Sequence, residues 1–143
     1  MKYYIIAGEA SGDLYGSKLI DEIFSVDAKA NIRFWGGDNM IKSGGHNVKH
    51  IKELAFMGFF EVLKNIRTII SNIRFCKNDI KDFNPDRIIY IDYPGFNLKI
   101  CKWAKNNGYK NYYYISPQIW AWKENRIKTI KNNIDKLYVI FPF

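Results

Sequence analysis

The segment Arg87–Asp92, with the sequence "RIIYID", decides the fold of this chain. Four apolar residues stand in a row there, the turn-forming "NPD" at 84–86 precedes them, and Asp92 follows them. An uninterrupted apolar run of this length is typical of a strand buried on both faces of a parallel sheet. Similar runs predict further strands at "KYYIIA" (2–7), "NIRFWGG" (31–37), "HNVKHI" (46–51), "KNYYYI" (110–115) and "KLYVIF" (136–141).

Helical patterns separate these apolar runs. They extend from Asp13 to about Phe24, from Asp38 to the "SGG" at 43–45, from Gly58 to Phe83, from Phe96 to Asn107, and from Lys123 to Asn133. Regular alternation of strand and helix, with continuously apolar strands, predicts an α/β fold. We therefore expect a Rossmann-like parallel sheet with helices on both faces.

Composition limits the functional classes. The 143 residues, of which 48% are hydrophobic, suffice for one folded domain with its own core. The net charge of +8 favours an anionic partner, such as nucleic acid, an anionic membrane surface or a phosphorylated substrate, and does not choose among them. An AT-rich genome would also produce this high Lys, Asn, Ile and Tyr content.

No metal site is expected. Cys76 and Cys101 stand alone in the sequence, and no carboxylate lies between His46 and His50. Isolated cysteines make a reduced, cytosolic protein the default. The apolar run near the N-terminus is too short for a signal peptide, and no segment has the length of a membrane span, so we expect any membrane contact to be peripheral.

The unusual motifs all follow predicted strands. In open parallel sheets, ligands bind beyond the carboxyl ends of the strands. The segments at these ends are "GEASGD" (8–13), "WGG" (35–37), "DYPGFN" (92–97) and "SPQIWAW" (116–122). This clustering predicts a binding site at one edge of the sheet.

Two of these segments supply the first candidates. Backbone N–H groups of "GEASGD" could hold an anion or hydroxyl groups; the alternative is a tight turn in which Asp13 caps the next helix. Without GxGxxG or a P-loop, neither a dinucleotide nor an ATP site is supported. Asp92 is placed to accept a proton from a substrate hydroxyl, or else to tie down the following turn. The substrate-binding candidates in the first segment are Gly8, Glu9, Ser11, Gly12 and Asp13.

Together these segments resemble the lipid-A-disaccharide synthase family. The matching stretches are "AGEASGD" (7–13), "LAFMGFFEVL" (54–63), "PDRIIYIDYPGFN" (85–97), "YYISPQIWAWKENRI" (113–127) and "FPF" (141–143). The resemblance implies that residues 1–143 are the N-terminal, acceptor-side domain of a GT-B glycosyltransferase. It also implies that a C-terminal nucleotide-sugar domain lies outside this chain.

The resemblance further implies a reaction. UDP-2,3-diacylglucosamine and 2,3-diacylglucosamine 1-phosphate would be joined into the disaccharide precursor of lipid A, with release of UDP and without metal or cofactor. Asp92 matches the proposed base that deprotonates the acceptor 6-hydroxyl. Some members carry an acidic residue where this chain has Gly95. The remaining substrate-binding candidates, in the crevice wall, are Ser116, Gln118 and Trp120.

The stretch 56–81 combines an apolar stripe with a basic face. It predicts either an amphipathic helix packed on the sheet or one that docks on an anionic membrane. The second interpretation agrees with the resemblance, which implies a cytoplasmic enzyme peripheral to the inner membrane and compatible with a homodimer at full length. The candidate membrane contacts are Phe59, Phe60, Leu63, Lys64 and Arg67.

Three alternatives remain. Another GT-B transferase or epimerase acting on a UDP-sugar would keep the fold and change the substrate. The chain could also be an inactive acceptor-binding fragment. A nucleic-acid module is disfavoured, because the basic residues are scattered over several helices and most aromatic residues belong to strands.

Overall fold

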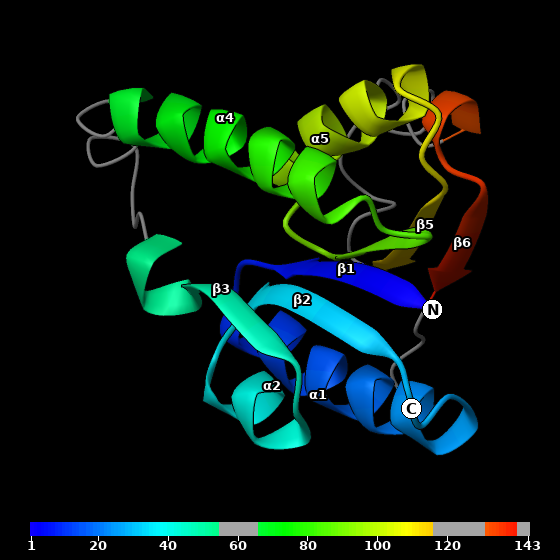
Figure 1. The fold of residues 1–143 in the computed structure, drawn as a ribbon. Coiled ribbons are helices and arrows are strands. Elements are labelled where there is room, and N and C mark those ends of the chain that lie inside the picture. Colours follow the sequence, from blue (N-terminus) through cyan, green and yellow to red (C-terminus); the bar gives the residue numbers. More distant parts are fainter. Residues whose placement is uncertain (55–65, 116–130, 140–143) are drawn as a thin grey trace.

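The computed structural model describes residues 1–54, 66–115 and 131–139. Its sheet has six described strands, all parallel, in the order β3-β2-β1-β4-β5-β6 (Figure 1). This is the order of a Rossmann fold, in which the direction of winding reverses between β1 and β4. The strands are β1 (Lys2–Ala7), β2 (Asn31–Gly36), β3 (His46–His50), β4 (Arg87–Ile91), β5 (Asn111–Ile115) and β6 (Lys136–Val139).

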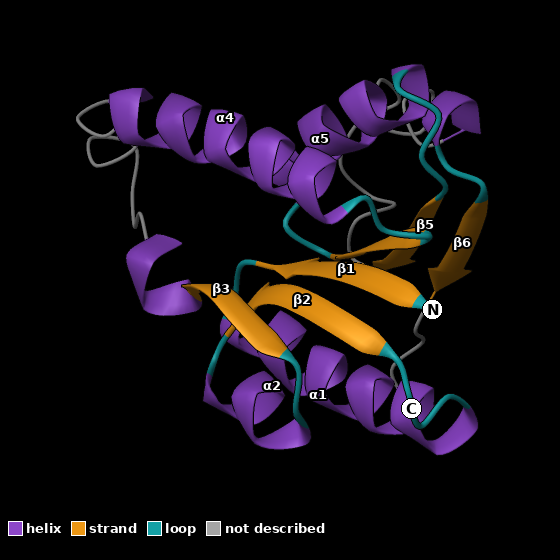
Figure 2. Cartoon of the chain, viewed as in Figure 1, coloured by secondary structure: helices purple, strands orange, loops and turns teal. Residues whose placement is uncertain are grey.

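Helices cover both faces of the sheet, as the sequence predicts. α1 (Ala10–Val26) and α2 (Asp38–Ser43) lie on one face, whereas α4 (Ile66–Phe83) and α5 (Pro94–Asn106) lie on the other (Figure 2). A short 3-10 helix, η1 (Ile51–Leu54), follows β3. The predicted α/β class, a Rossmann-like parallel sheet with helices on both faces, is confirmed.

The strands are apolar throughout because each of them contributes to two cores. In β1, Tyr4 and Ile6 belong to the core beneath α4 and α5, whereas Ile5 and Ala7 belong to the core against α1. β4 alternates in the same way, and its residues Ile88, Tyr90 and Ile91 are almost fully buried. Successive side chains of a strand point to opposite faces, so a sheet covered on both sides needs apolar residues at every position.

Two helix boundaries differ from the predictions. α1 begins at Ala10 rather than Asp13, because the chain leaves its extended form only after Glu9 and the small residues at 10–12 carry no apolar period. α5 begins at Pro94 rather than Phe96, since proline is favoured in the first helical turn. η1 was not predicted. The helical predictions over 58–65 and 123–130 lie outside the described residues, as do the last two residues of the final predicted strand.

Candidate functional site

The carboxyl ends of β1 and β4 lie side by side at the point where the strand order reverses (Figure 1). Ala7 pairs with Ile91, so Gly8 and Glu9 follow one strand where Asp92 and Tyr93 follow its neighbour. Ligands of open α/β sheets bind at such a switch point. The structure therefore brings together the first and third motifs that the sequence singles out.

The turn after β4 has an uncommon backbone. Asp92 (φ 47°) and Tyr93 (φ 52°, ψ 55°) are consecutive residues in the left-handed region. Each such residue costs about 1–3 kcal/mol unless its surroundings impose the conformation. Here the Asp92 N–H donates to the Tyr114 carbonyl at 3.0 Å, and Tyr113 Oη donates to the Asp92 carbonyl at 2.6 Å.

Asn97 completes the support of this turn. Its side chain is fully buried, and its Nδ2 donates both to the Asp92 carbonyl at 2.9 Å and to the Ile6 carbonyl at 3.2 Å. One amide thus ties the turn after β4 to the end of β1. Strained residues held by several bonds are a feature of functional sites, so the geometry favours a role for Asp92 beyond closing the turn.

Tyr93 packs against the end of β1. A Cβ on Gly8 would lie 2.4–2.5 Å from three atoms of the Tyr93 ring, so only glycine fits at position 8. The ring also stacks on Phe96, with centroids 5.4 Å apart and planes at 23°. Gly8 is thereby explained by a close approach of an aromatic ring, a contact that the sequence motif alone does not reveal.

Two carboxyl groups share this edge. Glu9 as a residue is exposed, but its carboxyl is partly screened from water, and this partial burial, with the nearby charge of Asp92, raises the pKa of the carboxyl above the ordinary value. Burial, with the charge of Glu9, also raises the pKa of the Tyr93 phenol. The edge is therefore acidic, and two carboxylates outweigh the half positive charge at the start of α1.

Asp13 is turned toward the start of α2, which follows β2. Its carboxylate is buried and accepts three backbone N–H groups at the start of α2, from Gly37 at 2.8 Å, Asn39 at 3.1 Å and Met40 at 3.0 Å. The expectation that Asp13 caps its own helix is wrong. Because α1 starts three residues earlier, Asp13 lies within its first turn and reaches the neighbouring helix instead. These contacts connect α1 to the start of α2.

Some of the other candidates lie within the described residues, and the rest lie outside them. Ser11 is exposed in the first turn of α1, whereas Gly12 is buried there and faces Ala7 and Ile91. Arg67 is exposed on α4. Tyr93 and Asn97 were missed, although both stand in the quoted "DYPGFN" motif. The candidates outside the described residues are Ser116, Gln118, Trp120, Phe59, Phe60, Leu63 and Lys64.

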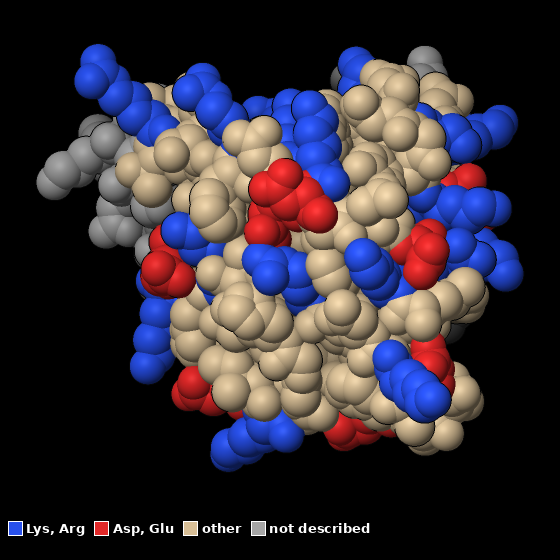
Figure 3. Space-filling model, viewed as in Figure 1, with Lys and Arg blue, Asp and Glu red and all other residues tan. Residues whose placement is uncertain are grey.

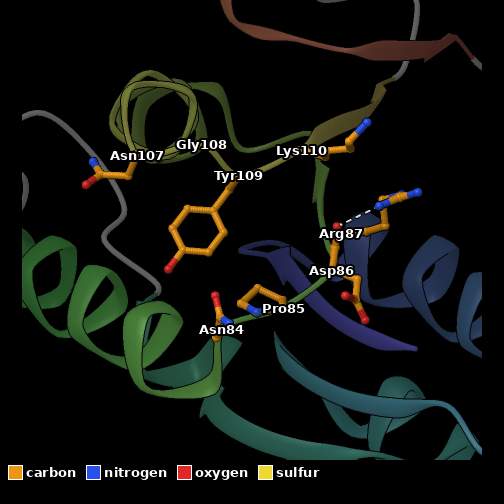
Figure 4. A pocket seen from close by; sticks show the side chains of 8 residues that line it. All are labelled: Asn84, Pro85, Asp86, Arg87, Asn107, Gly108, Tyr109 and Lys110. Carbon is orange, nitrogen blue, oxygen red and sulfur yellow. Dashed lines mark hydrogen bonds between the residues drawn. The ribbon is translucent and has the colours of Figure 1, made fainter.

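A pocket of about 330 Å³ lies at the opposite edge of the sheet (Figure 4). Three of its polar side chains are bonded within the chain: Asp86 accepts the Lys2 N–H, Arg87 donates to the Asp86 carbonyl, and Asn107 donates to the Trp103 carbonyl. We assign it no ligand. It is lined by Asn84, Pro85, Asp86, Arg87, Asn107, Gly108, Tyr109 and Lys110.

The described residues contain no group of three or more potential metal ligands. His50 instead contacts the Asp38 carboxylate at 2.9 Å. Cys76 and Cys101 are buried free thiols, and burial raises the pKa of both, that of Cys101 to about 12, so neither has the character of a nucleophile. On the face seen in Figure 3, lysine and arginine are interspersed with acidic and neutral residues. No helix in the described ranges is long and apolar enough to span a membrane.

The strand order, which reverses between β1 and β4, defines this chain as a Rossmann-like α/β unit. A family model described as lipid-A-disaccharide synthetase matches residues 3–143. The chain therefore belongs to the lipid-A-disaccharide synthetase family.

Individual relatives agree with this assignment. The chain is 42% identical to lipid-A-disaccharide synthases of Trichlorobacter lovleyi and Geobacter metallireducens, and 41% identical to that of Coxiella burnetii, over 97% of its own length. It spans only about a third of these relatives, 36–37%. Among solved structures, UDP-GlcNAc 2-epimerase from Neisseria meningitidis, crystallised with UDP-GlcNAc, matches 97% of the chain and 40% of its own, with a TM-score of 0.63. At 11% identity, that likeness concerns the fold alone.

Proposed function

We propose that this chain is the N-terminal, acceptor-side domain of a GT-B glycosyltransferase. The enzyme joins UDP-2,3-diacylglucosamine to 2,3-diacylglucosamine 1-phosphate and releases UDP. Family membership supports the reaction, and the position of Asp92 at the switch point is the observation that carries it. In this proposal, a C-terminal domain outside residues 1–143 binds most of the nucleotide.

The chemistry assigned to this domain is the activation of the acceptor. Asp92 takes the proton of the acceptor 6-hydroxyl as its oxygen attacks the anomeric carbon of the donor. The bond from that carbon to the UDP oxygen breaks on the opposite face, so the configuration inverts. This step requires a base that is held in a fixed position next to the hydroxyl. Asp92 stands on a turn that hydrogen bonds from Tyr113 and Asn97 hold in place.

The acidity of the site orients the acceptor. Glu9 and Asp92 repel a phosphate, so the 6-hydroxyl end lies at this edge and the 1-phosphate lies away from it. Gly8, Glu9 and the exposed Ser11 at the start of α1 bind sugar hydroxyls, with Ser116, Gln118 and Trp120 forming the crevice wall. We retain Gly12 and Asp13 in a supporting role, since both are buried.

Comparison of two proteins tests this function. A chain extended to the length of its relatives should form the disaccharide from both substrates, whereas residues 1–143 alone should form none. Product from the purified 143-residue chain would refute the division of labour between the domains. Transfer of unacylated sugars as fast as acylated ones would favour the alternative of another UDP-sugar enzyme.

We also propose that the segment around α4 docks on an anionic membrane, where acylated substrates reside. Ile66 and Ile70 on α4 are 48% and 52% exposed, and Arg67 is exposed between them. An apolar surface next to positive charge suits an anionic bilayer. The proposed contacts are Phe59, Phe60, Leu63, Lys64 and Arg67. This placement supports an enzyme that is peripheral on the inner membrane.

Liposome binding tests the docking proposal. Replacing Phe59 and Phe60 by Ser should weaken binding to all vesicles, by up to about 1.5–3 kcal/mol for each fully inserted ring. Neutralising Lys64 and Arg67 should weaken binding to anionic vesicles only, by about 1 kcal/mol per charge, with the effect fading at high salt. If the Phe59 and Phe60 variants melted at lower temperature but bound vesicles as well per folded molecule, these side chains would belong to the core instead.

A further inference from the structure

Tyr93 occupies a position that does not suit tyrosine. It is the N-cap of α5, where residues with short polar side chains are preferred, and its side chain forms no capping hydrogen bond. It also adopts a positive φ that bulky residues rarely take. Local preference therefore opposes this residue, and its tertiary contacts must offset the cost.

Those contacts bridge the switch point. One side of the ring lies against the backbone of Gly8 at the end of β1, and Phe96 stacks on it with a centroid distance of 5.4 Å. Phe96 in turn contacts the fully buried Trp35, with centroids 5.2 Å apart. The ring is thus anchored in the core and spans from the turn after β4 to the end of β1.

The two residues next to this bridge are the acidic ones. Glu9 follows Gly8 directly, and Asp92 precedes Tyr93 directly. Any shift between the two backbone segments changes the separation of the two carboxyl groups. We infer that Tyr93 is a positioning residue, whose ring fixes Asp92 and Glu9 relative to each other at the ligand edge. The expected effect of Tyr93 on transfer rests on the proposed function, whereas its expected effect on Glu9 rests on the packing alone.

Two substitutions separate positioning from local strain. Tyr93→Phe keeps the ring and removes the hydroxyl. Tyr93→Gly removes the ring but relieves the positive φ, since glycine adopts that conformation freely. If Tyr93 only tolerated a strained turn, Tyr93→Gly would function as well as the parent chain. A positioning role predicts that Tyr93→Phe behaves like the parent chain and that Tyr93→Gly does not.

The first measurement needs no transferase activity. In the 143-residue chain, the Glu9 carboxyl carbon is followed by NMR as a function of pH. Among the described residues, burial and then the charge of Asp92 act on the Glu9 carboxyl, while Asp13 is turned toward α2. Glu9 should titrate above an ordinary glutamate in the parent chain and in Tyr93→Phe, and should move back toward ordinary values in Tyr93→Gly, because water enters where the ring was. An unchanged Glu9 titration in Tyr93→Gly would overturn the inference.

The second measurement uses a chain of the length of its relatives. Tyr93→Gly should lower turnover by about 10- to 100-fold, the usual consequence of a displacement near 1 Å, with the KM for the UDP-sugar changed less than about twofold. Tyr93→Phe should stay within about threefold of the parent. Equal losses in both variants would assign the effect to the hydroxyl and overturn the positioning role. A parent chain without any transferase activity would refute the proposed function instead and leave the NMR result standing.

A further variant covers the case in which Tyr93→Gly does not fold. Phe96→Leu removes the stacking partner and leaves the backbone at Tyr93 unchanged. It should shift the Glu9 titration and the turnover in the same direction as Tyr93→Gly, by a smaller amount. A folded Phe96→Leu chain with parental values of both quantities would contradict the inference.

Discussion

Arg33 on β2 and Asp79 on α4 form a two-point ion pair across the face of the sheet. Arg33 Nη2 lies 2.6 Å from Asp79 Oδ1, and Arg33 Nε lies 3.2 Å from Oδ2. Tyr4 Oη also donates to Oδ2, at 2.8 Å, and itself accepts from Trp35 Nε1 at 2.8 Å. These four side chains attach the second half of α4 to β1 and β2, whereas Ile66 and Ile70 in its first half are exposed.

The first prediction concerns this attachment. Asp79→Ala should lower the free energy of unfolding by about 2–3 kcal/mol, because it leaves a partly buried guanidinium and a tyrosine hydroxyl without their acceptor. Asp82→Ala, on an exposed part of the same helix, should change it by less than about 0.5 kcal/mol. Urea unfolding of both variants measures the difference. If Asp79→Ala and Asp82→Ala had equal free energies of unfolding, the ion pair would contribute little to the stability of the fold.

The second prediction tests the base. In a chain of the length of its relatives, Asp92→Asn should reduce turnover by about 10²- to 10⁴-fold, with little change in substrate affinity. Asp86→Asn is the matched control, since Asp86 precedes β4 at the opposite edge of the sheet and its carboxylate accepts the Lys2 N–H. Steady-state kinetics of both variants decide the matter. Near-normal turnover in Asp92→Asn would remove Asp92 from the mechanism.

The third prediction concerns the cap of α2. Asp13→Ala should destabilise the chain by about 2–3 kcal/mol, because three N–H groups lose a buried, charged acceptor. Asp21→Ala, on the exposed side of the same helix, serves as control and should have almost no effect. Thermal and urea unfolding provide the comparison. A stable Asp13→Ala chain that fails to bind acceptor would instead assign Asp13 to the substrate.

The fourth prediction is a pH dependence. The pKa of Glu9 is raised in the folded chain, so the folded state holds this proton to higher pH than the unfolded state does. The contribution of Glu9 to stability is therefore present below its unfolded pKa of about 4.3 and is lost as pH rises through the folded pKa. Glu9→Gln, which cannot ionise, should gain stability over the parent chain at pH 7 and none at pH 3. Unfolding curves at both pH values check this, and a gain of equal size at both would exclude the electrostatic cause.

Packing does not require glycine at position 95. Among the described residues, a Cβ there would meet no atom within 4 Å, so the site has room for a side chain. In the same part of the chain, the acidity of the edge at β1 and β4 comes from Glu9 and Asp92.

The strands, and the edge of the sheet at which their carboxyl ends meet, could be predicted from the sequence. A strand with both faces covered must be apolar at every position, which makes segments such as Arg87–Ile91 recognisable without a structure. The alternation of strands and helices then implies a parallel sheet, and a parallel sheet places all carboxyl ends, with Gly8 and Asp92 among them, at one edge. These conclusions need only local periodicity and the geometry of the sheet.

Contacts between distant segments were decided by the tertiary structure alone. The sequence indicated a cap at Asp13, but the helix that it caps begins 25 residues further on, at Asp38. Likewise, the local sequence does not specify the left-handed turn at Asp92 and Tyr93, because aspartate merely tolerates that conformation and a bulky tyrosine rarely adopts it. It exists because Tyr113, Asn97 and Gly8 hold it from β5, α5 and the end of β1. Local energies select strands and helices, whereas the strained geometry of the site is imposed by packing between elements that meet only in the folded chain.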